Sequence, residues 1–547
     1  MSAVRVGRSG FGRIIATAGL VSLTLAGAGT ASGAASRPLQ TASSSHTLNL
    51  AFTEDTQPLD PDVYYAGQGL PVILGEYEGL VQYEQLPVKY TGSTSFQAPG
   101  SRPRIVPDLA SSWTESPDGL TYTFHLVPHV LFHDGTPFTS TAVKVDFARR
   151  LAVNGGPAYQ VAPVASVATP SPLVAVVHLK HPVSAFMDYL ASAYGPKMIS
   201  PTVLSGHAGK DFAQTWLTTH DGGTGPYTMT KAIVGQEYVL SYSKLYRGPK
   251  PYYTTIDVKV IPDISTQELE LERGQLTMLL QGLSTSAIAQ LKTNKSFHVY
   301  AIPTLETTSL WVNPHLGILT SQAARVAVAD AIDKATVMNI AYPGRSVLED
   351  QIYPLGEFTD GSDKVAYSYK ASKLSTIVKN SSASKAIILG WEQPDPTDLQ
   401  VAEVIQTELA STGLQVTVKG YTDTALYGYA TNQAGAPNLI VETNWPDAAA
   451  PDTWTRIMMY KGGGLNYFEC SVPAGDALLD KGLAATSQSV ASSDDAQAGL
   501  VYSASGCWDL IGSRGDTIVA PSWMGGIVHQ IPVPISVVLA DLHPTSN

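Results

Sequence analysis

Three histidines at intervals of four residues are the first side chains whose spacing could do chemistry. On a helix, His125, His129 and His133 would share one face, and imidazoles arranged in this way can bind zinc. The stretch that carries them alternates apolar and polar residues and contains turn signals, which predicts strand and turn instead. The three rings are therefore not expected to converge, and we predict no metal site and no cofactor.

Catalytic motifs are missing from the sequence. It has no G-x-S-x-G elbow, no H-E-x-x-H pair, no Walker loop and no Cys/His cluster with metal spacing. Residues 223–227, GTGPY, contain two glycines but lack the following Lys-Ser/Thr that a phosphate loop needs. These absences favour binding over catalysis, so we expect the chain not to be an enzyme.

The N-terminus has the pattern of an export signal. Arg5, Arg8 and Arg13 precede an apolar run over residues 14–28, and small residues follow at 31–35. This order predicts a signal peptide over residues 1–35, and the Gly and Thr inside the run disfavour a membrane anchor. Residues 36–46 are predicted to be a disordered leader. The mature chain is then expected in a periplasm, at the cell surface or outside the cell.

Cys470 and Cys507 are the two cysteines of the sequence. In an exported chain two cysteines usually pair, and no CxxC or histidine spacing indicates a redox or metal site. We therefore predict a disulfide between them, which would stabilise the fold by about 2–4 kcal/mol.

Length and charge narrow the class further. A chain of 547 residues is too long for one hydrophobic core and should form two or more domains. Its formal net charge of −12 argues against nucleic acid as a partner, because phosphates require a basic surface.

The elements that would position any site are clearest over residues 107–150. Trp113, Tyr122, Phe124 and Leu126 alternate with polar residues, and Pro-Asp-Gly at 117–119 predicts the turn of a hairpin. A second turn, HDGTP at 133–137, precedes a predicted helix. Thr139 or Ser140 would cap that helix, and Val143, Phe147 and Ala148 would form its apolar face.

This segment resembles the hallmark region of the family 5 extracellular solute-binding proteins, the oligopeptide- and dipeptide-binding components of ABC importers. The order P-x-LA-x-x-W, DG-x-TYTF-x-L and HDGTPFT matches that family. Further matches are LDP at 59–61, GTGPY at 223–227, and a helix predicted over 322–340 that carries Arg325 and Asp333. The resemblance extends over about residues 48–544.

The resemblance implies an α/β, two-lobed periplasmic-binding-protein-like fold of the type II, cluster C kind, with an extra subdomain in the first lobe. Lobe I would comprise residues 47–305 with the subdomain inserted at about 90–222, lobe II residues 306–515, and residues 516–547 would return to lobe I. Independently, the order of strand 385–390, helix 399–412 and strand 413–416 predicts a parallel βαβ unit. The chain should cross between lobes near residues 302–310.

The resemblance also indicates ligand contacts. Peptide-binding relatives have a Trp and then an Asp, which pairs with the peptide's α-ammonium group, where this chain has Asn444-Trp445-Pro446-Asp447. Asp447 is therefore predicted to bind the ammonium, the alternative being a local turn role, and Asp452 to cap a helix that begins at Thr453. Trp445 would form a pocket wall or anchor its loop. The resemblance implies an edge strand that contacts the ligand's main chain, and weaker candidates follow the LDP loop; the remaining candidate ligand residues are Asn444, Asn466, Tyr467, Phe468, Tyr64 and Tyr65.

The function that the resemblance implies is capture of a short peptide between two closing lobes, for delivery to an ABC permease by a monomeric binding protein. Other solutes, such as sugars, metal chelates or opines, remain open, as does a sensor without transport. A secreted hydrolase is the third possibility. Many relatives carry a lipid on a cysteine at the cleavage position, but no cysteine lies there in this chain.

Overall fold

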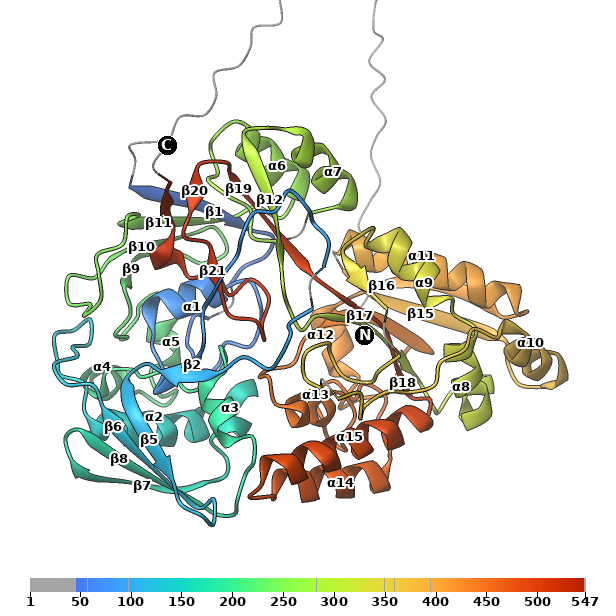
Figure 1. The fold of residues 1–547 in the computed structure, drawn as a ribbon, viewed down its shortest axis with the longest axis horizontal. Helices are drawn as coiled ribbons and strands as arrows, with labels where there is room; N and C mark the ends of the chain where they lie inside the picture. Colours follow the sequence, from blue (N-terminus) through green and yellow to red (C-terminus); the bar gives the residue numbers. More distant parts are fainter. Residues whose placement is uncertain are drawn as a thin grey trace, which may run out of the picture. The chain divides into compact units, whose positions relative to one another are not determined.

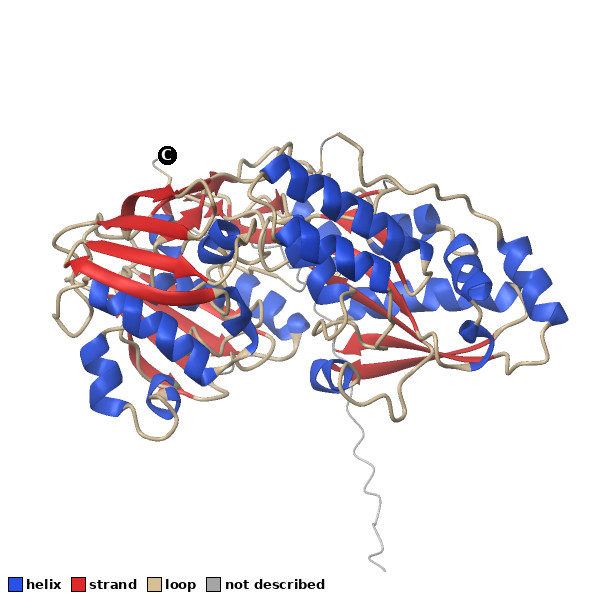
Figure 2. Ribbon diagram, turned by 90° about the horizontal axis from the view of Figure 1, so that it is seen from below, coloured by secondary structure: helices blue, strands red, loops and turns tan. Residues whose placement is uncertain are grey.

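The structure is a computed structural model in which the predicted signal peptide and leader up to residue 45 lie outside the described residues. It describes residues 46–545 apart from Gln57, Gln97, Gly282, Glu349, Thr359 and Pro394. All of these belong to the compact unit Ala42–Asn547. Within that unit, helices and strands are mixed in two groups of elements, on the left and on the right of Figure 1, and Figure 2 shows both kinds in each group.

The first group contains two four-stranded sheets. One has the order β1-β11-β10-β9, with β1 parallel to β11 and the other pairs antiparallel. The second is antiparallel in the order β5-β6-β8-β7, and helix α2 packs on it. Their strands are β1 (Thr47–Phe52), β9 (Tyr227–Ile233), β10 (Glu237–Tyr242), β11 (Thr255–Val260), β5 (Ala110–Glu115), β6 (Thr121–Leu126), β7 (Val164–Ser171) and β8 (Val174–Leu179).

Short helices and strand pairs complete this group. The pairs are β2 with β4, β3 with β21, β20 with β22, and β12 with β19. The bounds are α1 (Leu70–Glu76), α2 (Ser140–Val153), η1 (Gly156–Gln160), α3 (Phe186–Ala191), α4 (Pro201–His207), α5 (Gln214–Leu217), α6 (Ile264–Glu272), α7 (Thr285–Thr293), η3 (Leu539–Asp541), β2 (Val81–Tyr83), β3 (Leu86–Pro87), β4 (Ile105–Pro107), β12 (Phe297–Ile302), β19 (Asp516–Pro521), β20 (Met524–Gly525), β21 (Val528–His529) and β22 (His543–Pro544).

The predicted hairpin and helix of residues 107–150 are confirmed as β5, β6 and α2. Tyr122, Phe124 and Leu126 are buried, as their alternation predicts. Thr139 takes the N-cap position, as predicted, although its side chain makes no cap hydrogen bond. The prediction for Ala148 was wrong, because this residue is exposed instead of lying on the apolar face.

The second group is built on one six-stranded sheet of order β14-β18-β13-β17-β15-β16. Strand β13 is buried along its whole length because it packs on both faces: Leu310 and Val312 enter one core and Trp311 enters the other. The bounds are β13 (Thr307–Val312), β14 (Ser346–Val347), β15 (Ala386–Gln393), β16 (Gln415–Thr422), β17 (Leu439–Asn444), β18 (Trp508–Arg514), η2 (Gly317–Thr320), α8 (Gln322–Asp330), α9 (Lys334–Ala341), α10 (Ala371–Asn380), α11 (Pro396–Ser411), α12 (Asp423–Gly428), α13 (Pro451–Met458), α14 (Pro473–Leu483) and α15 (Gln488–Ala504).

The parallel βαβ unit is confirmed where β15, α11 and β16 follow one another, since β15 pairs in parallel with β16 and β17. The rest of this sheet is antiparallel, because β13 pairs antiparallel with both β17 and β18. The single helix predicted over residues 322–340 was wrong. Asp333 accepts a hydrogen bond from Thr336 N (3.2 Å) as the N-cap of α9, so the chain forms two helices with a break between them.

The two groups are joined by neighbouring segments of chain. Strand β12 leads into β13, and β18 leads into β19, so that Ile302 faces Asp516 in one strand pair and Thr307 faces Ser513 in the next. Paired crossings allow two halves to move as a hinge. The chain therefore has the two-lobed α/β fold that the sequence implies, while the exact lobe boundaries stay a prediction.

The GTGPY stretch lies against α1. Its two glycines are needed for close packing and not for a backbone conformation with positive φ. Neither Gly223 nor Gly225 has a positive φ. A side chain at Gly223 would place its Cβ 2.0 Å from the carbonyl oxygen of Glu76, and one at Gly225 would come within 2.5 Å of Gly75 O. Close approach of two backbones thus requires glycine here.

His133 is a structural residue of its turn. Its Nδ1 contacts the carboxylate of Asp221, and its Nε2 lies 2.9 Å from the carbonyl oxygen of Gly225. Burial disfavours the charged ring, but the Asp221 carboxylate outweighs it and raises the pKa of His133. With both ring nitrogens on acceptors of its own domain, His133 has a structural role in the described chain.

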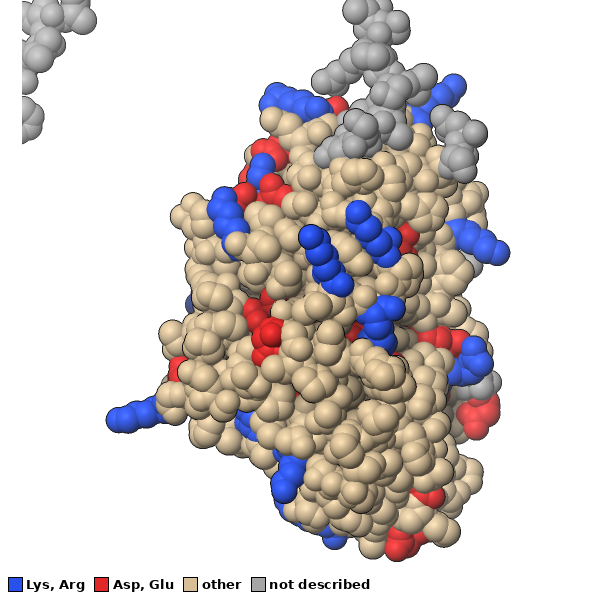
Figure 3. Space-filling view, turned by 90° about the vertical axis from the view of Figure 1, so that its left-hand side faces the viewer, with Lys and Arg blue, Asp and Glu red and all other residues tan. Residues whose placement is uncertain are grey.

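The surface carries few charges on at least one side. On the face shown in Figure 3, basic and acidic side chains are scattered among wide uncharged areas. That face presents no continuous basic stripe of the kind that nucleic acids need.

Candidate functional site

A cavity of about 780 Å³ lies between the two groups of elements. Its walls come from the segment after β1, from η1, from the loops after β15 and β17, and from the crossing strands. Pockets for small ligands span roughly 300–1,000 Å³, so the volume suits a solute of the size of a short peptide.

Asp447 is the most unusual side chain of this cavity. It follows β17 on one lobe, is only 6% exposed, and accepts hydrogen bonds at Oδ2 from the hydroxyls of Tyr65 and Tyr159, both on the opposite lobe. Burial raises its pKa to about 6, although the two hydroxyls and the charge of Arg150 act in the opposite direction. No Lys, Arg or His among the described residues forms an ion pair with it.

A fully buried arginine supports the two tyrosines. Arg150 of α2 donates to Asp62 Oδ1 (3.2 Å) in the LDP loop, to Pro157 O (3.1 Å) and Gln160 Oε1 (3.0 Å) of η1, and to the carbonyl oxygen of Tyr194. The LDP loop leads to Tyr65, and η1 carries Tyr159. One guanidinium therefore fixes three segments around Asp447, using its planar set of five donors.

The loop that carries Asp447 is docked into the opposite lobe. Ser192 donates to the carbonyl oxygen of Asp447 (2.5 Å), and the Ala449 N–H donates to the hydroxyl of Tyr83 (2.9 Å). Residues 448–450 are buried in the same core as the second four-stranded sheet. Asp447 thus has partners far away in the chain, and the alternative of a local turn residue does not describe its contacts.

The sequence suggests that Asp452 caps a helix, but in the structure it does not. Helix α13 already begins at Pro451, with Ala450 at its N-cap, and Asp452 lies in the first turn. There it pairs with Arg456 (2.7 Å) and accepts from the Tyr189 hydroxyl (3.2 Å). Its charge is therefore compensated within the protein.

Trp445 and Asn444 both line the cavity. Trp445 Nε1 donates to the Tyr194 hydroxyl (3.2 Å), and its ring lies against the backbone of Gly67, so that it forms a wall and anchors its loop at once. Asn444 donates to Glu442 Oε1 (3.0 Å). The structure brings both beside Asp447, and their roles in ligand binding stay a prediction.

Four predicted contacts lie elsewhere. Tyr64 is buried in the first lobe, where its hydroxyl accepts from Gly69 N–H, and the neighbouring Tyr65 lines the cavity. Residues 466–468 form turns instead of an edge strand, and they do not line the cavity. Asn466 holds its own loop, Tyr467 donates to Glu442 Oε2 (2.7 Å), and Phe468 is in the core. The preceding loop, residues 460–465, lines the cavity instead.

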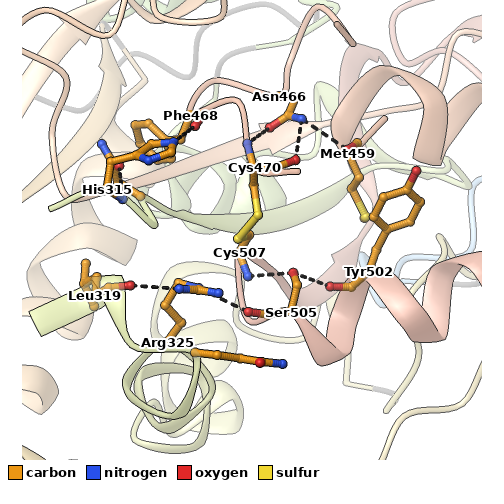
Figure 4. Close-up of a disulfide and its surroundings, with 12 residues drawn as sticks. His315, Leu319, Arg325, Met459, Asn466, Phe468, Cys470, Tyr502, Ser505 and Cys507 are labelled. Carbon is orange, nitrogen blue, oxygen red and sulfur yellow. Dashed lines mark hydrogen bonds between the residues drawn. A yellow bond between two sulfur atoms is a disulfide. The ribbon is translucent and has the colours of Figure 1, made fainter. Parts of the chain in front are cut away.

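A disulfide joins Cys470 to Cys507 next to that loop. Figure 4 shows the disulfide with Asn466 beside it, hydrogen-bonded to Cys470 and to Met459. Its Oδ1 accepts from Cys470 N (3.0 Å), and its Nδ2 lies within 3.2 Å of the carbonyl oxygens of Cys470, Met459 and Tyr460. The disulfide therefore connects β18 to a wall of the cavity through one asparagine.

Removing the disulfide should affect both stability and binding. We expect a Cys470→Ser/Cys507→Ser variant to lose about 2–4 kcal/mol of unfolding free energy, because the cross-link restricts the unfolded chain. Solute binding should weaken as well, since the cavity loop loses its anchor. Urea unfolding and calorimetric titration measure the two effects. Unchanged affinity would show that Asn466 holds the loop by itself.

Acidic side chains outnumber basic ones in the cavity, at nine to four. Two of the cations have carboxylate partners: Arg514 pairs with Glu306 (2.9 Å) and Arg456 with Asp452. Arg345, only 4% exposed, donates to Thr285 Oγ1 (3.2 Å) and stacks over Tyr342, but forms no ion pair among the described residues. The cavity therefore has more acidic than basic side chains, together with one guanidinium that forms no ion pair with a carboxylate of the described residues.

Sequence reasoning missed Tyr159, Tyr194 and Arg150, although all three surround Asp447. No motif marks them, because Tyr159 and Asp447 are separated by 288 residues. Tyr65 and Tyr64 are both candidates from the sequence, and of the two only Tyr65 lines the cavity. A signal was present in the Asp60, Asp62, Arg149 and Arg150 set, since charged residues that are buried must pair.

Two α/β lobes, joined by paired crossing strands around a cavity of solute size, define the class of two-lobed solute-binding proteins. A family model for bacterial extracellular solute-binding proteins, family 5, matches residues 104–466. The chain belongs to this family, as the sequence implies, and its class is that of a binding protein and not an enzyme. No helix of the described part of the chain has the length and apolar character to cross a membrane.

Relatives agree with this assignment. The chain is 28% identical over 461 residues to the probable D,D-dipeptide-binding periplasmic protein of Escherichia coli, covering 82% of this chain and 85% of that one. DppA from Helicobacter pylori in complex with the peptide STSA has a TM-score of 0.77 at 20% identity, over 91% of this chain and 98% of that chain. NikA from Brucella suis in complex with Fe(III)-EDTA also has a TM-score of 0.77, at 22% identity, over 91% of this chain and 100% of that chain. These similarities to solved structures support the fold.

Proposed function

We propose that this protein captures a short peptide, or another solute with a protonated amine, for a membrane-bound ABC permease. It would act as an exported monomer whose lobes close on the solute. The observation that carries the proposal is the Asp447 carboxylate, which is buried in the wall of the cavity and has hydroxyl partners but no ion-pair partner in the part of the chain that the structure describes.

The energetic argument starts from the cost of that carboxylate. A buried charge without a countercharge is unfavourable, and Asp447 keeps a raised pKa for that reason. A ligand ammonium would supply the missing charge and a charge-assisted hydrogen bond. The surplus of carboxylates in the cavity also favours a solute with positive charge.

A peptide would also bring a carboxylate to the cavity. Arg345 is the cavity cation best suited to it, because it is buried and most of its guanidinium donors have no partner among the described residues. A bidentate contact between guanidinium and carboxylate would fix the orientation of the solute. Ammonium and carboxylate contacts together would favour zwitterionic solutes of limited length.

Relatives support a peptide without requiring it. One is named for a D,D-dipeptide and one holds the peptide STSA, while others are named for nickel, or were solved with Fe(III)-EDTA or agropinic acid. A metal chelate, sugar or opine therefore remains an alternative solute, and a sensor role an alternative use. A permease and an ATPase encoded beside this chain would favour transport.

A thermal-shift screen of the exported protein tests the proposal. We expect unmodified di- to pentapeptides to raise the melting temperature, and the same peptides with an acetylated N-terminus to raise it much less. A ligand at about a hundred times its dissociation constant stabilises the folded state by about 2.7 kcal/mol. Sugars and metal chelates serve as comparison classes. Stabilisation by these and by no amine would overturn the proposal.

A further inference from the structure

We propose that Tyr65 and Tyr159 are positioning residues that hold one oxygen of Asp447, so that the other oxygen receives a single ammonium in preference to a guanidinium. This inference rests on the proposed function and adds the group that the site selects. The tyrosines would act on this selectivity through Asp447.

The geometry begins with the two hydrogen bonds. Both hydroxyls donate to the same oxygen, Oδ2, with Tyr159 at 2.6 Å. Oδ1 accepts a hydrogen bond from none of the described residues, and Asp447 lines the cavity. The carboxylate therefore has one occupied and one free edge. An ammonium can bind Oδ1 alone, whereas the bidentate contact that the planar fork of a guanidinium favours uses both oxygens.

The donors come from two separate segments of the opposite lobe. Tyr65 lies after the LDP loop and Tyr159 in η1, while Asp447 follows β17 of the six-stranded sheet. The arrangement consequently exists only while the loop of Asp447 is docked against the first lobe. Formation of the amine site would thus be coupled to lobe closure.

Among the described residues, Arg150 is the one charged side chain that acts on the pKa of Asp447. Arg150, on α2, lowers the pKa of Asp447, but its own donors are committed to Asp62 and to backbone carbonyls. The Tyr194 ring lies edge-on to Tyr65 with centroids 5.1 Å apart, and Tyr189 lies edge-on to Tyr159 at 5.4 Å. Burial raises the pKa of Tyr65 and of Tyr159 well above the usual range, so both hydroxyls remain protonated donors.

A pH window for binding follows. The carboxylate must be ionised, which requires a pH above about 6, and a peptide amine must be protonated, which requires a pH below about 8. The two hydroxyls lower the pKa of Asp447 and so keep the window open at neutral pH. Without the two hydroxyls, the lower pH limit of binding should rise toward the upper pH limit.

The first test needs no solute. Carbon-13 NMR of protein labelled at aspartate Cγ, with Asp447→Asn to assign the signal, follows the titration of Asp447. We expect a midpoint near 6 in the unmodified protein and a rise of about one pH unit or more in Tyr65→Phe/Tyr159→Phe. Tyr64→Phe, which removes a buried hydroxyl one residue away, is the matched control and should leave the midpoint unchanged. An unchanged midpoint in the double variant would overturn the inference.

The second test measures selectivity by titration calorimetry at pH 7. The probes are trialanine, its N-acetyl form and its N-amidino form, which carries a guanidinium at the same end. The unmodified protein should prefer trialanine to the N-amidino probe by tenfold or more, and the double variant should lose this preference. Equal affinity of the unmodified protein for both cationic probes, or a preference kept by the double variant, would contradict the positioning role.

The two tests separate this inference from the proposed function. If no trialanine probe binds, the proposed solute class is in question, but the NMR titration still decides whether the tyrosines control Asp447. If the double variant does not fold, each single variant is titrated in the same way and should show part of the rise.

Discussion

Asp447→Asn is expected to stabilise the empty protein and to abolish much of its solute affinity. The pKa of Asp447 is raised from 3.8 to about 6, so the folded state binds this proton more tightly than the unfolded state does. Stability therefore falls as the pH rises through that interval, by at most about 3 kcal/mol for this group. The asparagine removes that penalty while its oxygen can still accept from the tyrosines.

Urea unfolding at two pH values measures the first half of this prediction. At pH 7.5 the variant should gain about 1–3 kcal/mol in unfolding free energy, and below about pH 3 the difference should vanish because Asp447 is then protonated in both states. A gain that does not depend on pH, or a loss, would show that the carboxylate is satisfied in the empty protein.

Calorimetric titration measures the second half. Loss of the carboxylate should weaken a peptide with a free amine by about 2–4 kcal/mol, or roughly thirtyfold to a thousandfold. An N-acetylated peptide, which brings no charge to this position, should lose far less. Asp447→Ala should discriminate between the two peptides in the same sense. Equal losses for both would count against the ammonium role. The variant should therefore gain stability and lose affinity, which is the expected result for a binding site that is costly to the stability of the fold.

The parts of the fold that the sequence predicts well are those held by local patterns. The hairpin β5–β6 follows from alternation and from Pro-Asp-Gly, which act within about twenty residues. The helix predicted over residues 322–340 failed for a similar local reason. Asp333 can cap a helix as well as continue one, and the apolar period on either side of it does not decide between the two.

The site follows a different rule, because it is assembled from distant segments. Asp447 was identified through its likeness to a family motif, but its two donors come from 382 and 288 residues away. Residues 466–468 have the apolar, aromatic composition of a strand, yet the hydrogen bonds of Asn466 fold them into turns beside the disulfide. Side chains that fill a core and side chains that line a cavity have the same composition, so Tyr64 and Tyr65 could not be separated without coordinates.

Arg150→Met should cost about 3–5 kcal/mol of unfolding free energy, the typical effect of removing one partner from a buried ionic network. Arg150 is 0% exposed, and methionine would leave Asp62 with one ionic partner fewer and the carbonyl oxygens of Pro157 and Tyr194 without this donor. Arg149 would still hold Asp60 and Asp62, so the LDP loop should loosen and not unfold.

The consequence for the site distinguishes this arginine from an ordinary core residue. Because Arg150 fixes η1 and the segment around Tyr194, its loss should displace Tyr159 from Asp447 and weaken amine-bearing solutes even in the folded fraction. Arg104→Met is the matched control, since Arg104 pairs with Glu84 on the surface and reaches no part of the cavity; it should change stability and binding little. Urea unfolding and calorimetric titration, run on both variants at a temperature where each is folded, separate the two effects. A destabilised Arg150→Met protein that binds with full affinity would mean that η1 keeps its position without the guanidinium, and that the tyrosines depend on packing instead of on this network.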